Sequence, residues 1–164
     1  MEPFNTASEE DLEQALLRCL RSHRWAGRVA DHRPYPDLDS LLAAADEAAY
    51  DLGWSDLTEA LAAEPLPALP PDTYAAAHTA LRAAHAAYEA RFGHVFVICL
   101  DGMSPSETLD RLLEAIRSRL TNDPEDERAV VADELRRLAS GRLVSALRGA
   151  GNCANDHNAP APGR

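Results

Sequence analysis

The chain has 164 residues and a net charge of −11, from 27 acidic and 16 basic side chains. This is the length of one domain with room for a buried core, and the negative charge argues against nucleic acid or an anionic membrane as a partner. Alanine dominates the 46% of hydrophobic residues, and only 5% of residues are aromatic. This composition favours an all-α fold, a compact single-domain helical bundle, over sheets.

The first predicted helix begins near Ser8, where the sequence SEED resembles a capping box. Leucines then recur at helical spacing as far as Leu20. A loop over residues 32–35 follows, because it contains a proline, which is disfavoured inside a helix. Two helices, from about residue 39 to 50 and from about residue 55 to 63, come next.

Residues 64–72, EPLPALPPD, contain four prolines and predict a non-helical connection. Asp72 or Thr73 is then expected to cap a long alanine-rich helix that ends near residues 92–93. Residues 94–100, HVFVICL, are the one strand-like run. Because no partner strand is evident, we predict one short, buried extended segment rather than part of a sheet.

Two helices complete the predicted bundle. Ser104 is the expected N-cap of the first, with proline in its first turn and glutamate three residues after the cap. Asn122 or Asp123 is expected to cap the last helix, which also has proline in its first turn. After about Arg148 the residues are small and polar, so we expect a folded domain over residues 1–148 and a disordered tail over 149–164.

The three cysteines follow no metal-binding spacing, and their odd number argues against a disulfide framework. Cys19 and Cys99 lie in apolar stretches and are expected to be small core residues rather than nucleophiles. The first residues lack the basic and apolar regions of a signal peptide, and no apolar run is long enough to span a bilayer. We therefore expect a cytoplasmic protein without membrane contact.

His78 and His85 share one face of the alanine-rich helix, but they lie too far apart along its axis to ligate one metal ion. Metal-binding histidine pairs, glycine-rich phosphate loops and nucleophile elbows are missing from the sequence. We expect neither a metal nor a cofactor. Arg142, set among apolar positions of the last helix, has two open interpretations: it extends to solvent, or it clamps a carboxylate or ureido group.

Several stretches, in the right order and covering most of residues 4–148, are typical of one family. The most specific are YEARFGHVFVIC (88–99) and RLTND (119–123); the others are Phe4-Asn5, residues 19–46, residues 56–65 and ELRRLASGRL (134–143). With them the chain resembles the 2-oxo-4-hydroxy-4-carboxy-5-ureidoimidazoline (OHCU) decarboxylases of urate degradation. The resemblance implies an all-helical fold, a homodimer, and a cofactor-free lyase that removes CO₂ from a small-molecule substrate to leave (S)-allantoin.

In that family a His-Pro pair supplies an imidazole, a Ser-x-x-Glu-Gln motif grips the ureido end, and an arginine of the last helix and an extended segment complete the pocket. The substrate-binding residues that the resemblance carries over are Pro65, Ile98, Cys99, Leu100, Asp101, Gly102 and Arg142.

The chain also departs from the family pattern. Glu64 stands where the family has histidine, and residues 71–75 keep nothing of the Ser-x-x-Glu-Gln motif. Glu64 could transfer the proton if burial raised its pKa toward neutrality, whereas an ionised Glu64 would repel a substrate carboxylate. Tyr74, His78 or His85, from the alanine-rich helix, could face the same pocket.

Three functions stay open on the sequence. In the first, the chain is a divergent OHCU decarboxylase, with Glu64, His78 and His85 as its candidate catalytic residues and with Arg142 positioning the anion. In the second, the pocket serves another small-molecule reaction or only binding. In the third, the chain is a non-catalytic dimeric interaction protein whose alanine-rich helix is the interface.

Overall fold

The computed structural model describes residues 1–155, with residues 150–155 described by their backbone alone. This part of the chain forms eight helices and no strand, which confirms the predicted all-α fold. The helices are α1 (Glu2–Thr6), α2 (Glu9–Cys19), α3 (His23–Asp31), α4 (Leu38–Tyr50), α5 (Trp54–Ala63), α6 (Ala75–Phe92), α7 (Pro105–Arg119) and α8 (Pro124–Asn155). None of these helices is both long and apolar enough to cross a membrane.

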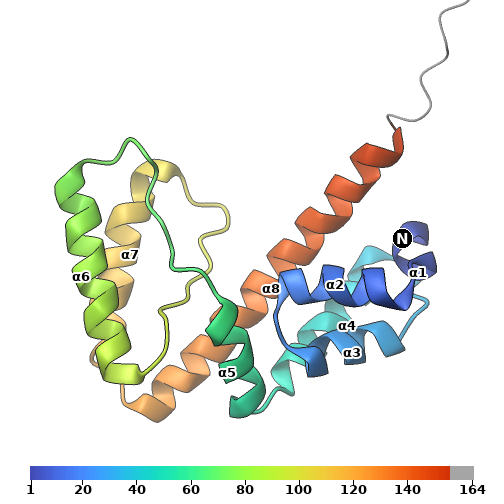
Figure 1. The fold of residues 1–164 in the computed structure, drawn as a ribbon, viewed down its shortest axis with the longest axis horizontal. Helices are drawn as coiled ribbons and strands as arrows, with labels where there is room; N and C mark the ends of the chain where they lie inside the picture. Colours follow the sequence, from blue (N-terminus) through green and yellow to red (C-terminus); the bar gives the residue numbers. More distant parts are fainter. Residues whose placement is uncertain (156–164) are drawn as a thin grey trace, which may run out of the picture.

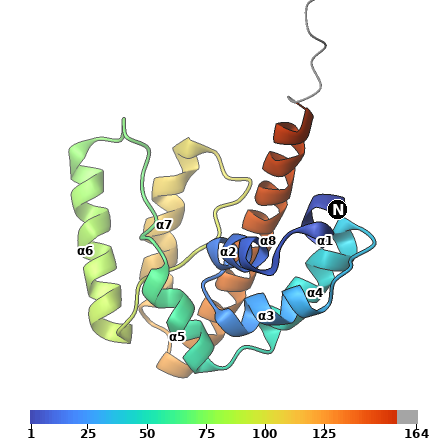
Figure 2. The ribbon, with the colours of Figure 1, turned by 45° about the vertical axis from the view of Figure 1, so that its right-hand side comes forward.

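The long helix α8 organises the molecule (Figure 1). Helix α3 packs on α2 and on α4, and α2 and α4 also pack on α8. Their core is centred on Trp25, whose indole N–H donates to the Ala45 carbonyl at 2.9 Å and so joins α3 to α4. Helices α6 and α7 lie side by side as a separate pair (Figure 2), around a second core that contains Tyr88 and Phe96.

The predicted helix starts at Ser8 and Ser104 are confirmed. The Ser8 hydroxyl accepts a hydrogen bond from the Asp11 amide at 3.1 Å, and Ser104 forms a capping box with Glu107 at the start of α7. Each cap satisfies an amide that has no partner inside its helix. The predicted helices that became α4 and α5 begin within one or two residues of their expected positions.

Two helices were not predicted. The short α1 holds the buried Phe4, and Asn5 exchanges two hydrogen bonds with the backbone of Tyr35, at 2.8 and 2.9 Å. Helix α3 begins after Ser22, whose hydroxyl accepts from the Trp25 amide at 3.3 Å. The chain breaks between α2 and α3 because Leu20 is extended, and the leucine pattern of α2 gave no sign of a new helix after it.

The connection over residues 64–74 is non-helical, as predicted, but the expected cap of α6 was wrong. Neither Asp72 nor Thr73 caps this helix; Tyr74 stands at the N-cap position. The reason is a turn over residues 70–73 that contains the two adjacent prolines, in which the Thr73 amide donates to the Pro70 carbonyl at 3.0 Å. At its other end α6 finishes as expected, with Gly93 in the left-handed region at a φ of 78°.

Residues 95–100 are neither helix nor strand, and Phe96, Val97 and Ile98 are buried, which confirms the predicted buried segment. Helix α8 continues to Asn155, past the boundary expected near residue 148, and projects beyond the other helices (Figures 1 and 2). Extending an existing helix adds one hydrogen bond for each residue fixed, so a polar sequence can continue it. The rest of the expected tail, residues 156–164, lies outside the described residues.

Candidate functional site

The centre of the candidate site is an ion pair between α8 and the end of α5. Arg142 donates from Nη1 to Glu64 Oε1 at 2.7 Å and from Nη2 to Oε2 at 2.8 Å. Nη1 also donates to the Cys19 carbonyl at 3.1 Å. The Glu64 side chain is only 6% exposed, and its hydrogen bonds raise the pKa of Arg142 although burial opposes the shift. Arg142 therefore clamps a carboxylate, and that carboxylate belongs to its own chain.

A cavity of about 230 Å³ opens beside this pair. Its walls are largely apolar, from the proline-rich connection on one side and from residues 97–101 on the other. Of the site residues expected from the sequence, those that line it are Glu64, Pro65, Ile98, Leu100, Asp101 and Arg142. The fold thus gathers residues from the connection after α5, from the segment over residues 97–101 and from α8 around one small space.

Cys99 and Gly102 line a neighbouring polar hollow of about 590 Å³, which shares Asp101 with the cavity. Burial raises the pKa of the Cys99 thiol, as it does for Cys19, so neither is activated as a nucleophile. Asp101 packs closely on α8: a Cβ on Gly141 would lie 2.2 Å from Asp101 Oδ2. Glycine at this position lets the Asp101 carboxylate reach the helix backbone.

Tyr74, at the N-cap of α6, and the two α6 histidines expected near the pocket do not line it. Tyr74 is 66% exposed, and neither it nor His78 lines the cavity. His85 is buried behind the cavity wall, with its ring centroid 5.9 Å from that of Phe96. The pairing of α6 with α7 turns these positions away from the Glu64–Arg142 pair.

The imidazole of His85 is poorly satisfied in its buried position. Neither ring nitrogen makes a hydrogen bond of ordinary geometry. Burial lowers the pKa of His85, and the nearby Pro67 backbone opposes this shift only in part. Since Pro67 itself lines the cavity, His85 is separated from it by one layer of residues.

The sequence reasoning missed the groups that hold residues 95–100 in place. Arg119, on α7, donates from Nη1 to the Val97 carbonyl at 2.6 Å and from Nε to Glu127 Oε1 at 2.8 Å. Glu127 is fully buried and also accepts from the Tyr88 hydroxyl and, at 2.8 Å, from Asn122. The signal available was an arginine and a glutamate at positions facing the apolar side of their helices.

A second tether comes from α8. Glu134 Oε2 accepts a hydrogen bond from the Cys99 amide at 2.7 Å, and the Glu134 side chain is only 13% exposed. Arg119 and Glu134 thus hold the extended segment from two different helices.

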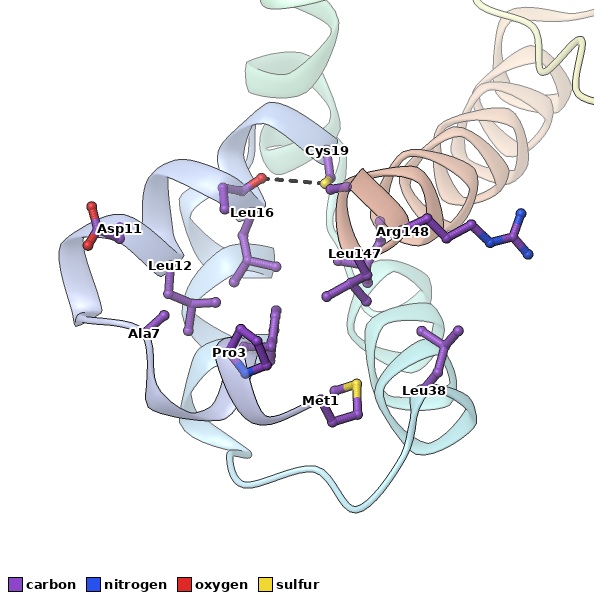
Figure 3. A pocket seen from close by; sticks show the side chains of 14 residues that line it. Met1, Pro3, Ala7, Asp11, Leu12, Leu16, Cys19, Leu38, Leu147 and Arg148 are labelled. Carbon is purple, nitrogen blue, oxygen red and sulfur yellow. Dashed lines mark hydrogen bonds between the residues drawn. The ribbon is translucent and has the colours of Figure 1, made fainter. Parts of the chain in front are cut away.

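An apolar hollow of about 410 Å³ lies elsewhere, between α1, α2 and α8 (Figure 3). Leucine side chains dominate its walls, and Figure 3 shows Asp11 and Arg148 at its edge, directed away from it. It therefore lacks convergent groups for proton transfer or anion binding. Among the described residues, the acidic, histidine and cysteine side chains form no cluster suited to hold a metal ion.

Comparison with known proteins gives a consistent result. The family model described as OHCU decarboxylase matches residues 5–69 and 68–144. A crystal structure of an OHCU decarboxylase in the presence of (S)-allantoin superposes with a TM-score of 0.70 at 22% identity, covering 85% of this chain and 97% of that one.

A crystal structure of (S)-allantoin synthase superposes with a TM-score of 0.69 at 18% identity, covering 88% of this chain. The chain spans 53% of that protein's length. At these identities the two structures show a shared fold. A search of curated proteins finds no match to the chain.

Proposed function

Because the chain belongs to the OHCU decarboxylase family, we propose that it removes CO₂ from 2-oxo-4-hydroxy-4-carboxy-5-ureidoimidazoline and leaves (S)-allantoin, without a cofactor. The observation that carries this proposal is the position of Arg142, whose planar fork lies in a small cavity beside residues 97–101. A guanidinium in such a place suits a carboxylate or ureido group.

The proposed reaction makes three demands on the site. The substrate carboxylate must be held while its bond to the ring carbon breaks and CO₂ leaves. The electron pair left behind gives enolate-like charge on the ring, and one face of the ring must then receive a proton. The apolar walls from Pro65, Ile98 and Leu100 favour loss of the charged carboxylate, because they keep water away from it.

Glu64 and Arg142 divide these roles in the proposal. Arg142 binds the substrate anion, which requires that Glu64 first give up its two hydrogen bonds to the guanidinium. The released Glu64 carboxylate then takes a proton from solvent and delivers it to the ring carbon that has lost CO₂. With Asp101 also in the cavity wall, the cavity has two carboxylates against one arginine, so substrate binding and displacement of Glu64 must occur together.

His85 is a second candidate for the proton transfer, because its imidazole lies one layer of residues from the cavity; burial lowers its pKa, so it would have to take up a proton before giving one. It would need a movement of the Pro67 connection to reach the cavity. Tyr74 and His78, also considered as site residues, would need a larger movement of the start of α6.

The test is a circular-dichroism time course of urate oxidised by a uricase, with and without the protein. The proposal expects the protein to speed the appearance of one allantoin enantiomer. An unchanged time course would count against it.

One observation favours a second function, a different small-molecule reaction or binding only. Glu64 already neutralises Arg142, and no imidazole is among the residues lining the cavity. A thermal-shift screen that raised the melting temperature with neutral ureides, in a protein that fails the urate test, would favour this alternative.

We also propose that the protein is a cytoplasmic homodimer that binds no nucleic acid. The dimer rests on the resemblance to the family, the location rests on cysteines whose odd number argues against a disulfide framework, and the exclusion of nucleic acid rests on the net charge of −11. Light scattering that gave a monomer mass at high concentration would refute the dimer, and would also remove the interaction-protein hypothesis.

A further inference from the structure

Residues 95–100 lack the regular hydrogen bonds of a helix or a strand, so other groups must satisfy and orient their backbone. Two charged side chains do so. Arg119 donates to the Val97 carbonyl at 2.6 Å, and Glu134 accepts from the Cys99 amide at 2.7 Å. Hydrogen bonds to charged groups are the strongest that a peptide makes, so both contacts are firm anchors.

These anchors hold the two peptide groups on either side of Ile98. One peptide group consists of the Val97 carbonyl and the Ile98 amide; the next consists of the Ile98 carbonyl and the Cys99 amide. A peptide group is planar, so fixing one end fixes the direction of the other. Arg119 thereby sets the direction of the Ile98 N–H, and Glu134 sets that of the Ile98 C=O.

Among residues 1–149, whose side chains the structure describes, no hydrogen bond involves the amide or the carbonyl of Ile98. Ile98 is only 6% exposed, and it lines the site cavity. Buried backbone groups are nearly always paired. An unpaired donor and acceptor on one residue of a cavity wall therefore suggest a partner that enters the cavity.

We propose that Arg119 and Glu134 are positioning residues, which aim the N–H and C=O of Ile98 at a bound cyclic ureide. The two groups together complement a ring edge on which a carbonyl oxygen lies next to an N–H, as in a cyclic amide or ureide. This inference rests on the proposed function for the identity of the ligand, which is the ring of the substrate or of (S)-allantoin.

The charges of the two side chains strengthen the hydrogen-bonding groups of Ile98. The Arg119 cation draws electron density from the Val97 carbonyl, which makes the Ile98 N–H a stronger donor. The Glu134 anion pushes electron density through the Cys99 amide, which makes the Ile98 C=O a stronger acceptor. Chains of hydrogen bonds polarise one another in this way.

Glu134 is the better residue to test, because Arg119 also holds the buried Glu127 and its loss threatens folding. The measurements are titration of the protein with (S)-allantoin, followed by the Ile98 and Cys99 amide signals in NMR, and kcat/KM in the urate assay. We expect Glu134→Ala to shift the Cys99 amide upfield and to weaken binding and kcat/KM about tenfold, the usual effect of one lost hydrogen bond.

Glu134→Gln keeps an acceptor for the Cys99 amide and removes the charge, so its affinity for (S)-allantoin and its kcat/KM should lie between those of wild type and of Glu134→Ala. If the alanine variant fails to fold, the same measurements are made on the glutamine variant. Asp133→Ala is the matched control. It removes a neighbouring carboxylate that pairs only with Arg136 and Arg137 on the same helix, and it should leave binding and turnover unchanged.

The results separate this inference from the proposed function. A Glu134→Ala protein that loses the Cys99 contact yet binds and turns over like wild type would overturn the inference alone. A wild type that makes no (S)-allantoin but binds it in a Glu134-dependent way would overturn the proposed function alone. A wild type that neither forms nor binds (S)-allantoin would overturn both.

Discussion

Arg142 and Glu64 are 78 residues apart in the chain, and the guanidinium of one reaches both carboxylate oxygens of the other. The pair joins α8 to the first residue after α5 and forms one wall of the site cavity. It also means that the arginine best placed to bind a substrate anion has a partner before the substrate arrives. In the proposed reaction, the substrate anion must therefore replace Glu64 at the Arg142 guanidinium when it binds.

Arg142→Lys keeps the positive charge and removes the planar fork. An ammonium group cannot make the same two parallel hydrogen bonds to a carboxylate. We expect kcat/KM in the urate assay to fall by about tenfold or more. Equal activity of the lysine variant would show that the fork does not bind the substrate; Arg137→Lys, which changes an exposed arginine of the same helix, is the control.

Glu64→Gln tests the proton-transfer role. Glutamine is close to glutamate in shape but cannot carry the proton, so kcat should fall by about 10²-fold or more. The same change removes the anion that occupies Arg142, so the substrate should meet less competition and KM should not rise. Steady-state kinetics separate the two effects, and a kcat like that of wild type would assign the proton to another group.

Gly141→Ala should change the melting temperature and kcat/KM through two different physical effects. Alanine in place of helical glycine stabilises a helix by about 0.5–1 kcal/mol. However, the new Cβ would lie 2.2 Å from Asp101 Oδ2, so the exposed Asp101 carboxylate must move away from the cavity wall. We expect an unchanged or higher melting temperature with a higher kcat/KM, because one of the two carboxylates that repel the substrate anion has left the cavity. Unchanged kinetics would show that the position of Asp101 has no part in the reaction.

His85 makes a prediction about pH. Its folded-state pKa is lowered by burial, so the unfolded chain binds a proton more readily than the folded protein. The free energy of unfolding should therefore fall as the pH drops below about 6.5, and continue to fall until the folded-state pKa is reached. Urea unfolding at several pH values measures this dependence. Below about pH 6.5 the free energy of unfolding should fall less steeply with decreasing pH for His85→Leu than for wild type. Parallel curves would refute the assignment.

The buried pair of Arg119 and Glu127 makes a prediction about folding. Glu127→Ala would leave the Arg119 cation buried without its partner, which costs about 3–5 kcal/mol. Thermal unfolding should show a melting temperature lower by roughly 6–20 °C. Glu114→Ala, which removes an exposed carboxylate paired loosely with Arg111, should change it little. A small loss in the Glu127 variant would mean that water replaces the carboxylate.

Local signals explain how far the fold could be predicted from the sequence. The caps at Ser8 and Ser104, the prolines of the connection and Gly93 each act within a few residues, and each marked its element correctly. Helix α3 was missed although local signals were present, because Ser22 is its N-cap and Trp25 and Val29 lie one turn apart on its buried face. The helix has only nine residues, which is shorter than the window over which hydrophobic periodicity is clear.

The site was less predictable than the fold. Arg142 and the extended segment could be named, because the family resemblance marks them. The roles of Arg119 and Glu134 could not, because each contacts the backbone of a residue more than twenty positions away. The expected approach of Tyr74 and His78 depended on the orientation of α6, which its pairing with α7 decides.

The most direct test of the account is the circular-dichroism time course of freshly oxidised urate, run with wild type, Arg142→Ala and Glu64→Ala at equal concentrations. The account predicts a rapid rise of the (S)-allantoin signal with wild type and its loss in both variants, each of which should be shown to be folded by far-ultraviolet circular dichroism. A wild-type trace identical to the spontaneous decay would contradict it, and would mean that the chain keeps the family's fold without its reaction.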